Sequence, residues 1–123
     1  MAEAIDHSLD ALLGLHGEVF VIDPKGEHWV KFEVRRVGAS PERPHGLKYS
    51  LTLHDAKGER LVGFDNAHPV TIGSGPSAKQ AEVFDHKHRL RTIKPYEYED
   101  AASLLDDFWK EVEAALAERG VKL

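Results

Sequence analysis

Two stretches of alternating apolar and polar residues constrain the fold of this chain more than any other feature. In residues 28–37, Val30, Phe32 and Val34 alternate with charged or large polar neighbours, and residues 47–54 repeat the pattern. A period of two places one set of side chains on a packed face and the other set on the opposite face. Both stretches are therefore predicted to be half-buried strands of an antiparallel sheet.

Turn residues separate these strands from further β-rich runs. Pro24-Lys25-Gly26 and Asp55-Ala56-Lys57-Gly58 are typical turn sequences, so each is predicted to close a hairpin. The predicted sheet has about five strands, in residues 18–23, 28–37, 47–54, 59–64 and 81–90.

Helical spacing of apolar residues appears at both ends of the chain. Residues 101–116 carry an apolar stripe, with Asp100 as the predicted N-cap and Gly120 just beyond the helix. Residues 3–15 show a shorter stripe. The expected fold is α+β: an antiparallel sheet of about five strands, a long C-terminal helix packed on one face and a short N-terminal helix, in a single domain over residues 1–123.

Composition narrows the chemistry. The 123 residues include no cysteine, which excludes disulfides, thiolate nucleophiles and thiolate metal ligands. No apolar run is long enough to cross a bilayer, and no secretory signal opens the chain. We therefore expect a cytoplasmic protein without a membrane partner.

The charge is unevenly distributed. The formal net charge is −5, but residues 19–96 hold thirteen of the sixteen basic residues, nine of the twenty-one acidic residues and six of the eight histidines. A basic, histidine-rich body between two acidic ends can hold a polyanion locally. The acidic ends are equally consistent with solvated helix faces.

The residues that could carry chemistry gather in two clusters at predicted strand ends. The fourth strand runs into Asp65-Asn66-Ala67-His68, and the fifth contains His86-Lys87-His88-Arg89. By strand parity, His86 and His88 share one face, while Lys87, Arg89 and Arg91 share the other. A twist near the strand end could bring Arg89 round to the histidine face. The two clusters meet only if the fourth and fifth strands are neighbours.

These residue types suit metal-free cleavage of RNA. The 2′-hydroxyl must lose a proton, the leaving 5′-oxygen must gain one, and the phosphorus centre needs added positive charge nearby. Histidine can carry out both proton transfers because its pKa lies near neutrality. His86, His88 and His68 are the candidate acid and base, and Asp65 could orient a ring. Arg89, Lys87 and Arg91 are candidate phosphate ligands, and Asn66 is a candidate substrate contact.

Three alternatives stay open. His-x-His is also a metal-ligand spacing that Asp65, His68 or Asp85 could complete, giving a metal-dependent hydrolase or a nucleotide-modifying enzyme. The third alternative is a non-enzymatic interaction module on which the histidines are incidental.

The segment 72–80 lacks the spacing of a phosphate-binding loop and is expected to be an exposed loop. No third metal ligand is fixed by a motif, so we expect neither a bound metal nor a cofactor.

The order of these motifs resembles the TumE family of small toxins. The resemblance rests on Asp65-Asn66-Ala67-His68, His86-Lys87-His88, and Tyr49 with Gly58 in the preceding hairpin, and covers about residues 19–116. The family often has proline before the histidine, whereas here Pro69 follows His68. The resemblance implies the toxin of a type II toxin–antitoxin system, an endoribonuclease acting on RNA and neutralised by a cognate DNA-binding antitoxin. A homodimer is compatible with the short apolar N-terminal helix.

Overall fold

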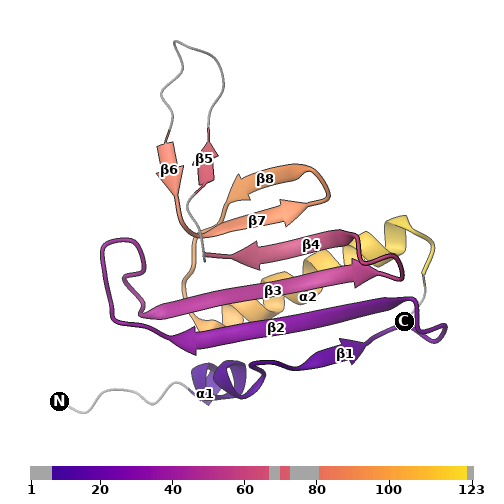
Figure 1. The fold of residues 1–123 in the computed structure, drawn as a ribbon, viewed down its shortest axis with the longest axis horizontal. Helices are drawn as coiled ribbons and strands as arrows, with labels where there is room; N and C mark the ends of the chain where they lie inside the picture. The colour runs from indigo at the N-terminus through magenta and orange to yellow at the C-terminus, as the bar shows by residue number, and fades with distance from the viewer. Residues whose placement is uncertain (1–6, 67–69, 73–80, 122–123) are drawn as a thin grey trace, which may run out of the picture.

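The computed structural model describes residues 7–66, 70–72 and 81–121 of the chain and gives an α+β fold (Figure 1). The two helices are α1 (His7–Gly14) and α2 (Ala101–Glu118). The strands are β1 (Val19–Val21), β2 (His28–Arg36), β3 (Leu47–Asp55), β4 (Arg60–Asp65), β5 (Val70–Ile72), β6 (Ala81–Val83), β7 (His86–Arg89) and β8 (Thr92–Pro95).

The main sheet has six antiparallel strands in the order β1-β2-β3-β4-β7-β8. Both predicted hairpins are confirmed, and the β2–β3 pair runs in unbroken register from His28 opposite Asp55 to Arg36 opposite Leu47. The alternation is also confirmed, because Val30, Phe32 and Val34 are buried between more exposed neighbours. Strand β4, which ends at Asp65, pairs directly with β7, which carries His86 and His88. The two strands that carry the polar clusters are therefore neighbours, as the predicted site requires.

Helix α2 covers one face of this sheet (Figure 1). Phe108 is fully buried and packs edge-on against Phe32 and Phe64, at ring-centroid distances of 5.7 and 6.1 Å. The predicted N-cap is confirmed, since the Asp100 side chain accepts a hydrogen bond from the Ser103 N–H. Gly120 ends the helix with φ 73°, a conformation that suits glycine.

The single strand predicted over residues 81–90 is wrong in detail. The chain bends at Phe84–Asp85, so that β6 pairs with β5 in a separate hairpin while β7 joins the main sheet. The sixth strand of the main sheet, β8, was also not predicted. It follows a turn at Leu90, a non-glycine residue with φ 52°, and the sequence there offers none of the usual turn residues.

The sheet therefore has two unlike faces. One face is covered by α2 and forms the hydrophobic core, and the opposite face, which we call the open face, is not covered by α2 (Figure 1). Helix α1 packs at the side of the sheet, with Leu12 in the core. Within the part of the chain that the structure describes, neither helix is long and apolar enough to cross a membrane.

Candidate functional site

The pairing of β4 with β7 brings three predicted site residues together on the open face. Asp65 lies directly opposite His86 in the register, and His88 follows on the same face of β7. Asp65 Oδ1 is 2.9 Å from His86 Nε2, and Asp65 Oδ2 is 3.6 Å from His88 Nε2. The two imidazole rings meet edge to face with centroids 4.7 Å apart. One carboxylate thus joins two histidines.

The two histidines differ in the hydrogen bonds available to them. His86 is only 2% exposed, and its Nδ1 lies 2.8 Å from the carbonyl oxygen of Phe84. Both ring nitrogens of His86 therefore face oxygen acceptors. A neutral ring carries one N–H and can donate to only one of these oxygens. Donation to both oxygens requires a second proton, and a cation bound at Nε2 would be the other way to make the contact with Asp65 attractive.

Arg60 supplies a positive charge to this group. Position 63 is glycine, and a Cβ there would lie 3.2 Å from Arg60 Cδ and 3.6 Å from His88 Cδ2. The missing side chain thus leaves room for the Arg60 stem beside the His88 ring. Burial lowers the pKa of His88 below its ordinary value of 6.5, and the charges of Arg60 and His86 lower it further, while Asp65 opposes them.

Asn66 fixes the position of the neighbouring Asp65 through hydrogen bonds to strand β3. It is fully buried, its Oδ1 accepts a 2.9 Å hydrogen bond from the Tyr49 N–H, and its Nδ2 donates to the Leu47 carbonyl at 2.8 Å. These bonds tie the end of β4 to β3 and so fix Asp65, the preceding residue. Asn66 was predicted to contact substrate, and in this structure its side chain contacts the β3 backbone.

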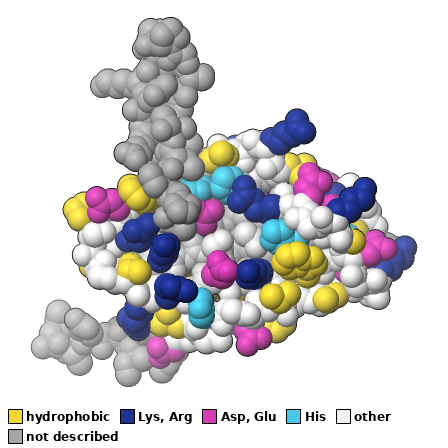
Figure 2. Space-filling view, in the orientation of Figure 1, with side chains coloured by type: hydrophobic (Ala, Val, Ile, Leu, Met, Phe, Trp, Pro, Cys, Tyr) yellow, Lys and Arg dark blue, Asp and Glu magenta, His cyan; other side chains and the backbone are white. Residues whose placement is uncertain are grey.

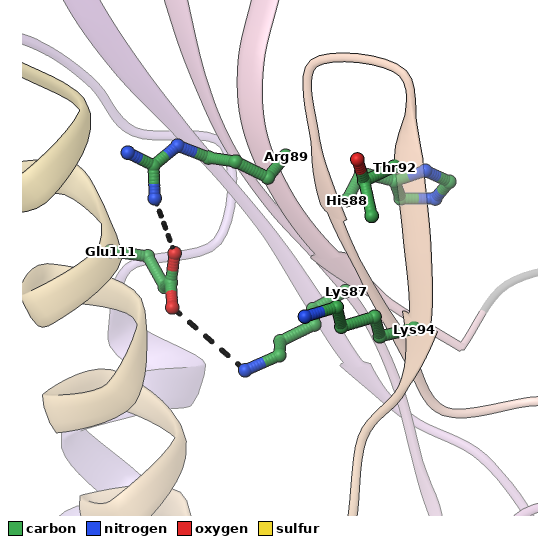
Figure 3. A pocket seen from close by; sticks show the side chains of 6 residues that line it. All are labelled: Lys87, His88, Arg89, Thr92, Lys94 and Glu111. Carbon is green, nitrogen blue, oxygen red and sulfur yellow. Dashed lines mark hydrogen bonds and ion pairs between the residues drawn. The ribbon is translucent and has the colours of Figure 1, made fainter. Parts of the chain in front are cut away.

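Lys87 and Arg89 lie on the other face of β7, as parity predicts. Arg89 Nη1 contacts Glu111 Oε2 at 2.7 Å, and Lys87 Nζ lies 3.8 Å from Glu111 Oε1. These cations line a pocket of about 270 Å³ between the β7–β8 hairpin and α2. Figure 3 shows both side chains extending toward Glu111 and His88 extending away from it. The structure does not bring Arg89 to the histidine face.

Two further site residues, Arg91 and His68, were predicted from the sequence. Arg91 is exposed in the turn between β7 and β8. His68 lies outside the described residues, as does most of the segment 72–80 that was expected to be an exposed loop.

Two features of this region were not predicted from the sequence. Arg60 sits at the start of β4, five residues before Asp65, and nothing in the linear sequence connects it with His88.

On the helix-covered face, the Tyr49 hydroxyl donates to Asp85 Oδ2 at 2.7 Å, and His45 Nε2 lies 3.4 Å from the same oxygen. Burial and the Asp85 charge raise the pKa of Tyr49 far above its ordinary value. This second cluster joins the bend before β7 to β3, so it positions the histidine strand.

The open face carries imidazole and basic side chains, and Arg60 lies beside His88. Figure 2 views this face and shows His side chains close to Lys and Arg side chains. Among the described residues, Asp65, His86 and His88 form the group whose donor atoms lie close enough together, all within 4.8 Å, to hold a metal ion. The arrangement can move protons between imidazoles, bind an anion beside Arg60, or chelate a cation.

Comparison with known proteins gives one result. The protein-family model described as Toxin TumE matches residues 19–116, which include all three side chains of the site. No curated protein sequence and no solved structure matches the chain significantly.

Proposed function

This chain belongs to the TumE toxin family. We therefore propose that it is the toxin of a type II toxin–antitoxin pair. We also propose that it cleaves RNA with Asp65, His86 and His88 as its catalytic side chains. The observation that supports this proposal best is the sharing of one carboxylate by two imidazoles beside a guanidinium, on a sheet face that α2 leaves open. These groups include a proton acceptor, a proton donor and a positive charge that can stabilise the phosphate.

His88 is the proposed general base. Its Nε2 stands 3.6 Å from Asp65 Oδ2, too far for a strong hydrogen bond, so this nitrogen can accept the proton of the 2′-hydroxyl. The attacking oxygen then bonds to phosphorus, and the bond from phosphorus to the 5′-oxygen breaks. A cyclic phosphate and a 5′-hydroxyl result.

His86 is the proposed general acid, and Asp65 orients both rings. The 2.9 Å contact of His86 Nε2 with Asp65 Oδ1 has the geometry of an imidazole N–H that donates to a carboxylate, and this N–H would supply the proton that the leaving 5′-oxygen needs. Arg60 is the proposed cation for the scissile phosphate, because it is the guanidinium beside His88. His68 remains a proposed substitute for either histidine.

Lys87, Arg89 and Arg91 keep a proposed role farther from the reacting atoms. Lys87 and Arg89 face α2 and are partly neutralised by Glu111, so they suit RNA phosphates beyond the scissile bond. Arg91 is exposed in the turn between β7 and β8. Asn66 is proposed to act through its hold on the strand that carries Asp65.

A test is expression of the wild-type chain beside His86→Ala and His88→Ala, with growth and RNA integrity as the readouts. His54→Ala is the matched control, because His54 belongs to the same sheet but its ring nitrogens contact Gly58 O and Thr52 Oγ1. We expect wild type and His54→Ala to arrest growth and degrade RNA, and the two site variants to do neither. Toxicity in both site variants would overturn the proposal. Co-expression of the cognate DNA-binding antitoxin should restore growth.

An interaction module without enzymatic activity is the second candidate. The edge strand β1 exposes Val19, Phe20 and Val21 by 52%, 41% and 63%, and an apolar edge strand of this kind is typical of a protein-binding surface. If growth arrest survives in both histidine variants but is lost when Val21 is replaced by Lys, this second function is supported instead.

A further inference from the structure

Asp65, His86 and His88 have the donor atoms and spacing of a metal-ligand set. We propose that these three side chains bind one divalent transition-metal ion of the zinc class, through a carboxylate oxygen of Asp65 and the Nε2 atoms of the two histidines. Metal binding by these residues does not require that the chain cleave RNA.

The distances between the donor atoms fit a small ion. Ligands about 2.0 Å from a tetrahedral Zn²⁺ are about 3.3 Å from one another. His86 Nε2 lies 2.9 Å from Asp65 Oδ1, and His88 Nε2 lies 3.6 Å from the other carboxylate oxygen, Oδ2. Each imidazole is thus at a ligand-to-ligand distance from one oxygen of the carboxylate. All three donor atoms lie within 4.8 Å of one another, so small side-chain rotations would close the set.

The His86 ring is already oriented as a metal ligand. Histidine ligands usually donate their other ring N–H to a carbonyl or carboxylate, which fixes the tautomer. Here His86 Nδ1 lies 2.8 Å from the Phe84 carbonyl oxygen, so the lone pair of Nε2 would point toward Asp65. A cation at Nε2 would satisfy both oxygens that the neutral ring cannot satisfy together.

The backbone holds the ligands before any ion arrives. Asp65 and His86 are register partners on adjacent strands, and Asn66 anchors the end of β4 to the interior of the sheet. Little conformational freedom is therefore lost on binding, which favours affinity.

The donor set also selects the class of metal. Two of the three donors are imidazole nitrogens, which suit Zn²⁺, Co²⁺ or Ni²⁺, whereas Mg²⁺ and Ca²⁺ prefer oxygen. Three protein ligands leave a further position for water or a phosphate oxygen. Arg60 and His88 lie side by side over Gly63, so the Arg60 guanidinium repels a cation and its removal should strengthen metal binding.

Metal binding has a consequence for catalysis that does rest on the proposed function. An ion on both Nε2 atoms would occupy the lone pair with which His88 takes a proton and would replace the proton that His86 gives. Zn²⁺ should therefore stop metal-free RNA cleavage as it fills the site.

The test is a titration of the untagged, chelator-treated full chain with Co²⁺, followed by displacement with Zn²⁺ in a calorimeter. We expect one equivalent per chain, with the visible absorption of a low-symmetry Co²⁺ site. His86→Ala, His88→Ala and Asp65→Asn should each weaken binding at least about tenfold, whereas His54→Ala and Glu33→Gln should bind as wild type does.

Arg60→Gln keeps all three ligands and should bind the metal ion more tightly than wild type does. A substitution that merely disturbed the fold would weaken metal binding, so tighter binding shows an electrostatic effect at a folded site. Absence of stoichiometric binding by the wild type, or unchanged binding by His88→Ala, would overturn the proposal. Cleavage is measured separately. Inhibition by Zn²⁺ supports both proposals, cleavage that requires Zn²⁺ overturns only the metal-free mechanism, and binding without any cleavage leaves the metal site standing while the proposed function falls.

Discussion

The two faces of strand β7 carry different side chains with different partners, although they belong to four consecutive residues. On the open face, His86 and His88 both contact the carboxylate of Asp65. On the other face, Lys87 and Arg89 contact Glu111 of α2. One strand can thus present chemistry to one side and anchor the helix on the other, and adjacent residues need not act together.

The largest expected effect comes from the carboxylate that joins the histidines. Asp65→Asn keeps the shape of the side chain but loses the charge that orients both rings, so we expect RNA cleavage to fall by roughly 10² to 10⁴. Glu33→Gln is the control, because Glu33 is an exposed carboxylate whose contact is Lys31. Single-turnover rates on a defined RNA provide the measurement. Equal losses in the two variants would contradict the proposed role of Asp65.

A smaller effect is expected from the cation on the same face. Arg60→Gln removes the charge beside His88 and should slow cleavage about 10²-fold, as loss of one stabilising donor does in other enzymes. Arg89→Gln removes a guanidinium from the opposite face, so it should weaken RNA binding but leave the cleavage rate of bound RNA almost unchanged. A larger loss for Arg89→Gln than for Arg60→Gln would reverse the assignment of the two faces.

Asn66→Ala tests how the site is supported. The variant leaves the Tyr49 N–H and the Leu47 carbonyl without their buried partner, so we expect the free energy of unfolding to fall by about 1–3 kcal/mol per unsatisfied group. Urea denaturation measures this loss. Asn66→Asp retains the acceptor for Tyr49 and loses the donor to Leu47, so it should also be destabilised. Full stability in both variants would show that Asn66 does not hold Asp65 in place.

The smallest effect belongs to the helix-covered face. Arg89 and Glu111 are partly solvent-exposed, so Glu111→Gln should lower the free energy of unfolding by only about 0.5–1 kcal/mol. The difference from wild type should shrink as salt is added. Cleavage by Glu111→Gln should stay near the wild-type rate. A large loss of activity without a loss of stability would place function on this face as well.

The main fold could be predicted because its signals are local. Alternation identified β2 and β3, and an apolar stripe with Asp100 and Gly120 at its ends identified α2. Strand β8 could not be predicted, because the turn before it uses Leu90 at φ 52° in place of glycine or asparagine. The bend at Phe84–Asp85 depends on contacts with Tyr49 and His45, which are far away in the sequence.

The site was predictable in part for the same reason. Parity alone separated His86 and His88 from Lys87 and Arg89, and the pairing of β4 with β7 supplied the contact with Asp65. Arg60 could not be found, because its place beside His88 depends on the absence of a side chain at Gly63 and on a register shift between Leu53 and His54. Burial of Asn66 likewise depends on packing that no local pattern reveals.

The most direct test of the central claim is an alanine scan along β7, with His86, Lys87, His88 and Arg89 replaced one at a time. The measurement is the single-turnover cleavage rate of purified, folded protein on one defined RNA. The two-face account predicts an alternating result, with activity lost at 86 and 88 and largely kept at 87 and 89. A uniform loss along the strand, or greater losses at 87 and 89, would contradict it.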